Sequence, residues 1–217
     1  MRALLTAAFL IAAIAPTAQA DTGPDDKPTL ITTDTQLPDD AEDLRGDGIL
    51  RDSSGRPVTH RLLGERLPDI SGQLVGGESI DAADLAGKWT VIVVWGVWCH
   101  DSRNDMDNIS HLADRLEDTT DVDFLSVHVP YTLAHLDTMY RNHGSVSGYF
   151  EHRGVSFPTL LDETGDLRAY LEVDWTPTYL VVAPDLTVHG YRTDLSISGD
   201  NAVEAFLKSI QKLRDGL

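Results

Sequence analysis

The hydrophobic residues of this chain fall into short apolar runs that alternate with stretches of helical spacing. Runs rich in β-branched and aromatic residues predict strands, and the two longest are apolar enough to be buried on both faces of a sheet. The predicted strands are 89–95, 122–129, 157–161, 179–183 and 188–193. Residues 49–63 predict a hairpin with its turn at 53–55, and Gly76–Gly77 predicts a second turn.

Between the predicted strands, apolar residues recur with the spacing of one helix face. The clearest stripe, which we interpret as core, is Met106, Ile109, Leu112 and Leu116. Shorter helices are predicted at 145–152 and 167–171, and a closing helix follows Asn201, which predicts a capping box with Glu204. This order of elements predicts one α/β domain with a central mixed β-sheet flanked by helices on both faces.

The first twenty residues have the organisation of a secretory signal peptide. Met1 and Arg2 form a short positive region, residues 4–15 are apolar, and Ala18-Gln19-Ala20 is a small-x-small cleavage site. An uncleaved N-terminal anchor is the alternative interpretation. We therefore expect residues 1–20 to be a signal peptide, the protein to be periplasmic or secreted, and the cleaved chain not to insert in a membrane.

The segment that follows the cleavage site is polar and acidic. Residues 21–47 are rich in Asp, Pro and Thr and show no sustained apolar period. They predict an acidic flexible tether, which leaves 48–217 as the folded domain.

Composition narrows the possible functions. The chain has 217 residues, with 35 Asp plus Glu against 17 Lys plus Arg and a formal net charge of -18. This excess of negative charge repels phosphate backbones and anionic lipid surfaces, and no local basic patch offsets it, so nucleic-acid binding is excluded. Cys99 is the only cysteine, which excludes an internal disulfide and a cysteine-rich metal site.

Cys99 stands where a buried strand gives way to a helix. Unpaired backbone N–H groups and the positive end of the helix dipole favour the thiolate there, and the thiolate is the reactive form of cysteine. A protonated His100 would act in the same direction, whereas Asp101 would oppose it. The alternative is an inert, buried thiol, but the position at a strand-to-helix junction favours a reactive one.

The segment Trp95-Gly96-Val97-Trp98-Cys99-His100-Asp101-Ser102 resembles the active site of the thioredoxin superfamily, in which a buried strand ends in Trp-Cys-x-x-Cys at the start of a helix. Further segments fall where TlpA/ResA-type extracytoplasmic thioredoxins carry similar ones. They are 67–70, 84–88, 157–162 and 175–181. The resemblance covers roughly Gly64 to Leu213 and implies a thioredoxin-like fold.

The resemblance also implies roles for individual residues. Pro177 matches a cis proline that faces the active-site cysteine, leaving the backbone of Thr176 free to bind an extended substrate. Asp105, six residues beyond Cys99, matches a helix carboxylate that manages proton transfer. Independently of the resemblance, we expect Trp98, directly before Cys99, to be a lid on the site that contacts the substrate. The alternatives are that Pro177 is a trans proline that opens a strand, that Asp105 is a solvated charge on the helix, and that Trp98 only packs against its neighbours.

The chain departs from the family pattern at Ser102, which occupies the position of the second, resolving cysteine. Cys99 can therefore attack a disulfide but cannot release its substrate by forming an internal one. A monothiol site can still isomerise disulfides, exchange with an external thiol, or hold a partner covalently. We expect Ser102 to donate a hydrogen bond to the sulfur of Cys99.

These observations predict an extracytoplasmic monothiol exchange protein that acts without a cofactor on disulfide-containing proteins or on small thiols such as glutathione. The alternative is a non-catalytic thioredoxin-fold protein that binds an extended peptide or protein partner. A peroxidase is disfavoured because peroxiredoxins carry Thr where this chain has Gly96. We also expect no metal site, and interpret His135, His143 and His152 as surface residues.

Overall fold

The computed structural model describes residues 29–132 and 143–217. The predicted signal peptide, the first part of the predicted tether, and residues 133–142 with the predicted surface residue His135 lie outside the described residues. Within the described part of the chain, no helix is long and apolar enough to cross a membrane.

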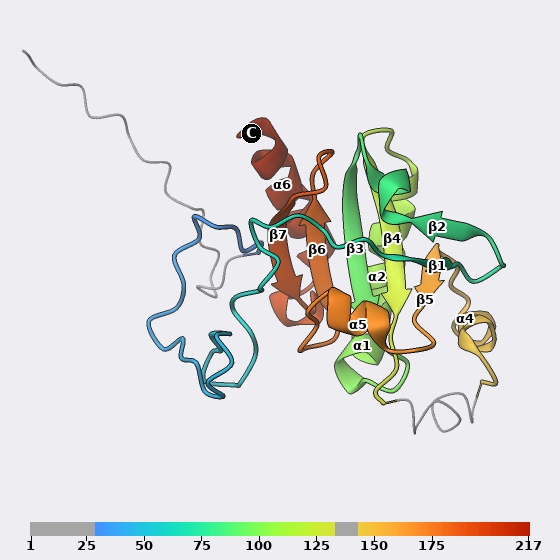
Figure 1. The fold of residues 1–217 in the computed structure, drawn as a ribbon, viewed down its shortest axis with the longest axis horizontal. Coiled ribbons are helices and arrows are strands. Elements are labelled where there is room, and N and C mark those ends of the chain that lie inside the picture. The colour runs from blue at the N-terminus through green and yellow to red at the C-terminus, as the bar shows by residue number, and fades with distance from the viewer. Residues whose placement is uncertain (1–28, 133–142) are drawn as a thin grey trace, which may run out of the picture.

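A five-stranded mixed sheet forms the centre of the domain, in the order β5-β4-β3-β6-β7 (Figure 1). Its strands are β3 (Trp89–Trp95), β4 (Val122–His128), β5 (Thr159–Leu161), β6 (Thr178–Val182) and β7 (Val188–Thr193). β3, β4 and β5 are parallel, whereas β6 and β7 are antiparallel to their neighbours. The two longest apolar runs of the sequence are therefore the two central parallel strands, as such runs predict.

Helices cover both faces of this sheet, as predicted. The apolar residues of α2 (Met106–Glu117), α4 (Val146–Arg153) and α6 (Ala202–Asp215) share one core cluster with Val91, Val93 and Trp95. α5 (Asp166–Tyr170) and a 3₁₀ turn, η1 (Ala82–Leu85), pack on the opposite face against Ile92 and Val94. The alternation of side chains along β3 thus divides the core into two layers.

A separate hairpin lies beside β5. It consists of β1 (Ser71–Gln73) and β2 (Ser79–Asp81), and its turn contains Gly76 and Gly77, as the sequence predicts. Leu74 pairs with Leu160, so this hairpin covers the β5 edge of the sheet. The hairpin predicted over 49–63 is reduced to isolated bridges around the turn at 53–55.

The segment before the domain is not a flexible tether over its whole predicted length. Leu30 and Ile31 are buried, and Ile31 exchanges backbone hydrogen bonds of 2.8 and 2.9 Å with Tyr191 in β7. Gly190 leaves room for this contact, because a Cβ there would lie 2.8 Å from Leu30. The prediction for 21–47 is therefore wrong at these positions, since two adjacent apolar residues are too few to give a periodic signal.

The predicted closing helix is present, but its predicted capping box is wrong. α6 begins at Ala202, directly after Asn201, yet the Asn201 side chain makes no capping hydrogen bond. The backbone of Asn201, at φ −111° and ψ 24°, lacks the extended conformation that aims a capping side chain at the helix. Glu204 instead forms an ion pair with Arg115 of α2.

Candidate active site

The candidate site lies at the C-terminal end of β3, where a short helix, α1 (His100–Asn104), begins (Figure 1). Cys99 is the residue that caps α1, and its backbone carbonyl accepts a hydrogen bond from Arg103 N–H at 3.2 Å. Its own N–H donates to the Gly96 carbonyl at 2.9 Å. The half-buried thiol is therefore held at the start of a helix, as the sequence predicts.

The sulfur of Cys99 lies against the loop that precedes β6. Cys99 Sγ donates a hydrogen bond to the carbonyl oxygen of Thr176 at 3.2 Å, and the Thr176–Pro177 peptide is cis, as the resemblance implies. The antiparallel pairing of β3 with β6, in which Val94 lies opposite Thr178, brings these distant segments together. This hydrogen bond means that the backbone oxygen of Thr176 faces the sulfur of Cys99.

Ser102 has a different partner from the predicted one. Its side chain is fully buried, and its Oγ accepts a hydrogen bond from Gly96 N–H at 3.3 Å. The sulfur of Cys99 bonds instead to the Thr176 carbonyl. Ser102 therefore ties the helix back to the end of β3, because the third residue of a helix points toward the turn that precedes it.

Trp98 folds back over the loop that it belongs to. Its indole Nε1 donates to the Val129 carbonyl at 2.8 Å. Its ring centre lies 5.0 Å from that of Tyr131 and 5.6 Å from the Arg168 guanidinium. The indole occupies the space where a side chain at position 96 would stand, since a Cβ on Gly96 would lie 2.3 Å from Trp98 Nε1. Gly96 is thus required by the position of Trp98.

This contact gives a prediction for stability. Gly96→Ala is expected to lower the free energy of unfolding by about 1–3 kcal/mol, the usual cost of overpacking a filled site. In a Trp98→Ala background the same change is expected to cost much less, because the clashing indole is gone. Chemical denaturation of the four proteins in this double-mutant cycle measures both costs, and equal costs in the two backgrounds would contradict the assignment.

Two arginines that sequence reasoning missed organise the loop around Cys99. Arg103 donates from Nη1 to the carbonyls of Val97 at 3.0 Å and of Trp98 at 3.1 Å. Arg168 of α5 reaches across to the carbonyls of Pro130 and Tyr131 at 3.2 and 3.1 Å. The sequence could have indicated that Arg103 lies near Cys99, because it follows four residues later and residues i and i+4 share a helix face.

Asp105 lies at the junction of α1 and α2, where the single helix predicted after Cys99 is divided. It is fully buried, which rules out a solvated helix charge. Its Oδ2 accepts hydrogen bonds from Tyr179 Oη at 2.6 Å and Leu195 N–H at 2.7 Å, and its Oδ1 accepts one from Asn108 at 2.7 Å. Burial raises the pKa of Asp105, and these hydrogen bonds oppose part of that rise.

His128, at the end of β4, also borders the loop and was not singled out from the sequence. It is buried, and its Nε2 accepts a hydrogen bond from Val97 N–H at 3.3 Å. Burial lowers the pKa of His128 to about 4, so the imidazole is neutral at physiological pH. It therefore acts as a fixed acceptor that positions the backbone two residues before Cys99.

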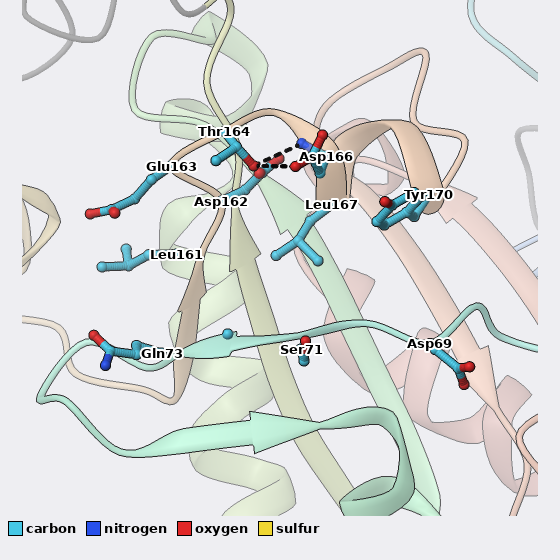
Figure 2. A pocket seen from close by; sticks show the side chains of 11 residues that line it. Asp69, Ser71, Gln73, Leu161, Asp162, Glu163, Thr164, Asp166, Leu167 and Tyr170 are labelled. Atoms are coloured by element: carbon cyan, nitrogen blue, oxygen red, sulfur yellow. Dashed lines mark hydrogen bonds between the residues drawn. The ribbon is translucent and has the colours of Figure 1, made fainter.

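A cavity of about 390 Å³ lies between β1 and the loop from β5 to α5, and none of the residues named around Cys99 lines it (Figure 2). Its charged lining residues are Asp69, Asp162, Glu163 and Asp166. The Asp162 carboxylate accepts from the N–H groups of Gly165 and Arg168 at 2.8 and 2.9 Å, which caps the start of α5. Among residues 29–132 and 143–217, no group of three or more His, Cys, Asp or Glu is arranged to hold a metal ion.

Comparison with known proteins agrees with this geometry. The thioredoxin domain of a thiol–disulfide oxidoreductase from Bacteroides vulgatus superposes with a TM-score of 0.50 at 17% identity, over 68% of this chain and 96% of that one. A DsbF homologue from Corynebacterium diphtheriae superposes with a TM-score of 0.50 at 18% identity, over 70% and 87% of the two chains. These similarities show a shared fold.

Sequence comparison adds a family. The thioredoxin-like protein YneN of Bacillus subtilis strain 168 is 25% identical over 118 residues, which are 54% of this chain. The match spans 64% of that relative's length. Residues 63–200 match the AhpC/TSA family. This match covers most of the chain and includes both Cys99 and the loop that faces it, so the chain belongs to the AhpC/TSA family and is a thioredoxin-like protein.

Proposed function

We propose that this protein is an extracytoplasmic monothiol thiol–disulfide exchange protein with Cys99 as its nucleophile. The Cys99 thiolate attacks one sulfur of a substrate disulfide, forming a mixed disulfide and releasing the other sulfur as a thiolate. A thiol of the same substrate, or an external thiol such as glutathione, then attacks the mixed disulfide and frees Cys99. The cycle makes one S–S bond for each one it breaks, so it needs no net oxidant or reductant.

The observation that carries this proposal is the contact of Cys99 Sγ with the carbonyl of Thr176, 3.2 Å away and directly before Pro177. An extended substrate that pairs with the backbone of Thr176 would place its own sulfur beside Cys99. Trp98 would border the bound substrate. Ser102 fills the position of a resolving cysteine with a group that cannot form a disulfide, which favours exchange over dithiol cycling.

Asp105 is proposed to manage the proton that the thiol must lose. Its carboxyl group is buried at the far end of α1 from Cys99, and its raised pKa keeps it closer to neutrality than an exposed aspartate. A raised pKa makes a carboxyl group a better proton acceptor than an ordinary aspartate, which suits it to take and return the proton.

A peroxidase has less support, because the Trp98 indole fills the space above Gly96 where peroxiredoxins carry Thr. For location, we propose that residues 1–20 are removed as a signal peptide and that the protein works in the periplasm or outside the cell, where disulfides persist. The folded domain is then proposed to begin near residue 48, with residues 29–47 lying along it.

Reaction with a defined disulfide tests this proposal. The folded protein, incubated with excess oxidised glutathione near neutral pH, is expected to gain one glutathionyl group on Cys99 and to lose it again on addition of reduced glutathione. Intact-mass spectrometry and peptide mapping measure both steps. The matched control is the denatured chain, whose thiol has no positioned partners. A folded protein that gains no adduct, while the denatured chain does, would show an inert thiol and contradict the proposal.

A further inference from the structure

A second buried carboxylate lies beside Asp105. Asp194 is 1% exposed, and the residue after it, Leu195, supplies the N–H group that Asp105 Oδ2 accepts. Two carboxylates in one core oppose each other's ionisation unless positive charge balances them. The positive charges packed around Asp194 therefore affect how easily Asp105 ionises.

Two arginines supply that positive charge. Arg192 of β7 is 5% exposed and donates to the carbonyl of Thr29 and to Ser198. Arg56 forms an ion pair with Asp194, and the exposed fractions of the two side chains are 19% and 2%. The other titratable groups that face the carboxylates are Tyr179, which donates to Asp105, and Tyr191 in β7.

Arg56 comes from outside the region that matches the AhpC/TSA family, which begins at residue 63. Its place is fixed by the turn at 53–55, in which Asp52 Oδ1 accepts from the N–H groups of Ser54 and Arg56 at 3.0 and 3.1 Å. Its guanidinium also lies 5.2 Å from the ring of Trp175, directly before Thr176. The turn thus brings one cation both to the loop that precedes β6 and to the buried carboxylate of Asp194.

We propose that Arg56 is a positioning residue that balances the charge of Asp194 and so makes Asp105 easier to ionise in the same core. The N-terminal segment that carries Arg56 is then part of the site. It influences the charge of Asp105, which lies at the end of α1 opposite to Cys99. The effect of Asp105 on the proton of Cys99 rests on the proposed function. The balance of charge between Arg56 and Asp194 does not.

The test is a pH titration of aspartate carboxyl carbons by NMR in the full chain. In Arg56→Gln, Asp105 is expected to keep its proton to higher pH than in wild type, with a change in its proton affinity on the order of tenfold, because the charge of Asp194 is no longer balanced. Arg56→Lys keeps the charge and is expected to titrate close to wild type. Arg61→Gln, the matched control, removes a cation of the same segment that pairs with Glu172.

An Arg56→Gln titration that superposes on wild type, or an equal shift in Arg61→Gln, would overturn the proposal. Should Arg56→Gln not fold, Arg56→Gln/Asp194→Asn removes both members of the pair and restores the balance of charge. Asp105 is then expected to titrate near its wild-type midpoint, and a midpoint raised in this double variant would show that Arg56 does not act through Asp194. The NMR titration of the carboxyl groups does not depend on thiol–disulfide exchange. It therefore tests the role of Arg56 even if Cys99 proves inactive.

Discussion

Replacing Cys99 with serine is expected to reduce the isomerisation of scrambled disulfides to the uncatalysed rate. Exchange requires attack by a thiolate on a disulfide sulfur, and the chain has no other thiol to take over. The serine hydroxyl can still donate to the carbonyl of Thr176, so the fold around the site is expected to persist. Recovery of activity by a scrambled disulfide-bonded protein, with and without the variant, measures the loss.

The matched control is His111→Ser, which changes an exposed histidine of α2 and leaves the sulfur and its sequence neighbours in place. It is expected to retain isomerase activity. Activity that survives in Cys99→Ser would sink the exchange mechanism. If wild type is also inactive but both proteins bind an extended peptide with the same affinity, then the site is a binding surface that uses the Thr176 backbone and not the thiol.

The strands could be predicted from the sequence because their signal is local. The run 89–95 is apolar at almost every position, and it forms β3 with the predicted bounds. The bounds of β6 and α4 differ by a residue or so from the predicted ones, since residues at the ends of elements are fixed by neighbours and not by their own pattern.

The candidate site was only partly predictable. Cys99 carries a local signal, the start of a helix after a buried strand, but its contact with Thr176 joins residues 77 positions apart. No periodicity reports such a contact, and it was expected only through the resemblance to thioredoxins. Ser102 shows the limit of that resemblance, because its Oγ accepts from Gly96 N–H, while the Cys99 thiol donates to the Thr176 carbonyl.

The pairing of Arg56 with Asp194 could not be predicted from the sequence. Arg56 and Asp194 are 138 residues apart, and each is an unremarkable polar residue in its own segment. Burial of Asp105 was likewise not evident, because the same spacing on a helix suits an exposed carboxylate. Such pairings depend on which surfaces meet in the folded chain, and the N-terminal segment that supplies Arg56 has the composition of a solvated linker.

Replacing Ser102 with cysteine is expected to give this protein the dithiol chemistry that it lacks. Residues three apart on a helix have Cβ atoms about 5–6 Å apart, so a small shift of the first turn brings the two sulfurs within bonding distance. The variant is expected to form an internal disulfide on oxidation and to gain disulfide reductase activity with a dithiol reductant, whereas wild type shows neither. Thiol counting under denaturing conditions and an insulin-reduction assay measure the two gains.

Ser102→Ala separates this gain from the loss of the serine itself. Both variants lose the hydrogen bond from Gly96 N–H, at a cost of about 1 kcal/mol, but only the cysteine variant can close a ring. A reductase activity that appears in Ser102→Cys and not in Ser102→Ala therefore belongs to the new disulfide. If Ser102→Cys keeps both thiols free under strong oxidant, the first turn of α1 does not bring positions 99 and 102 together, and the assignment of Ser102 to the resolving position is wrong.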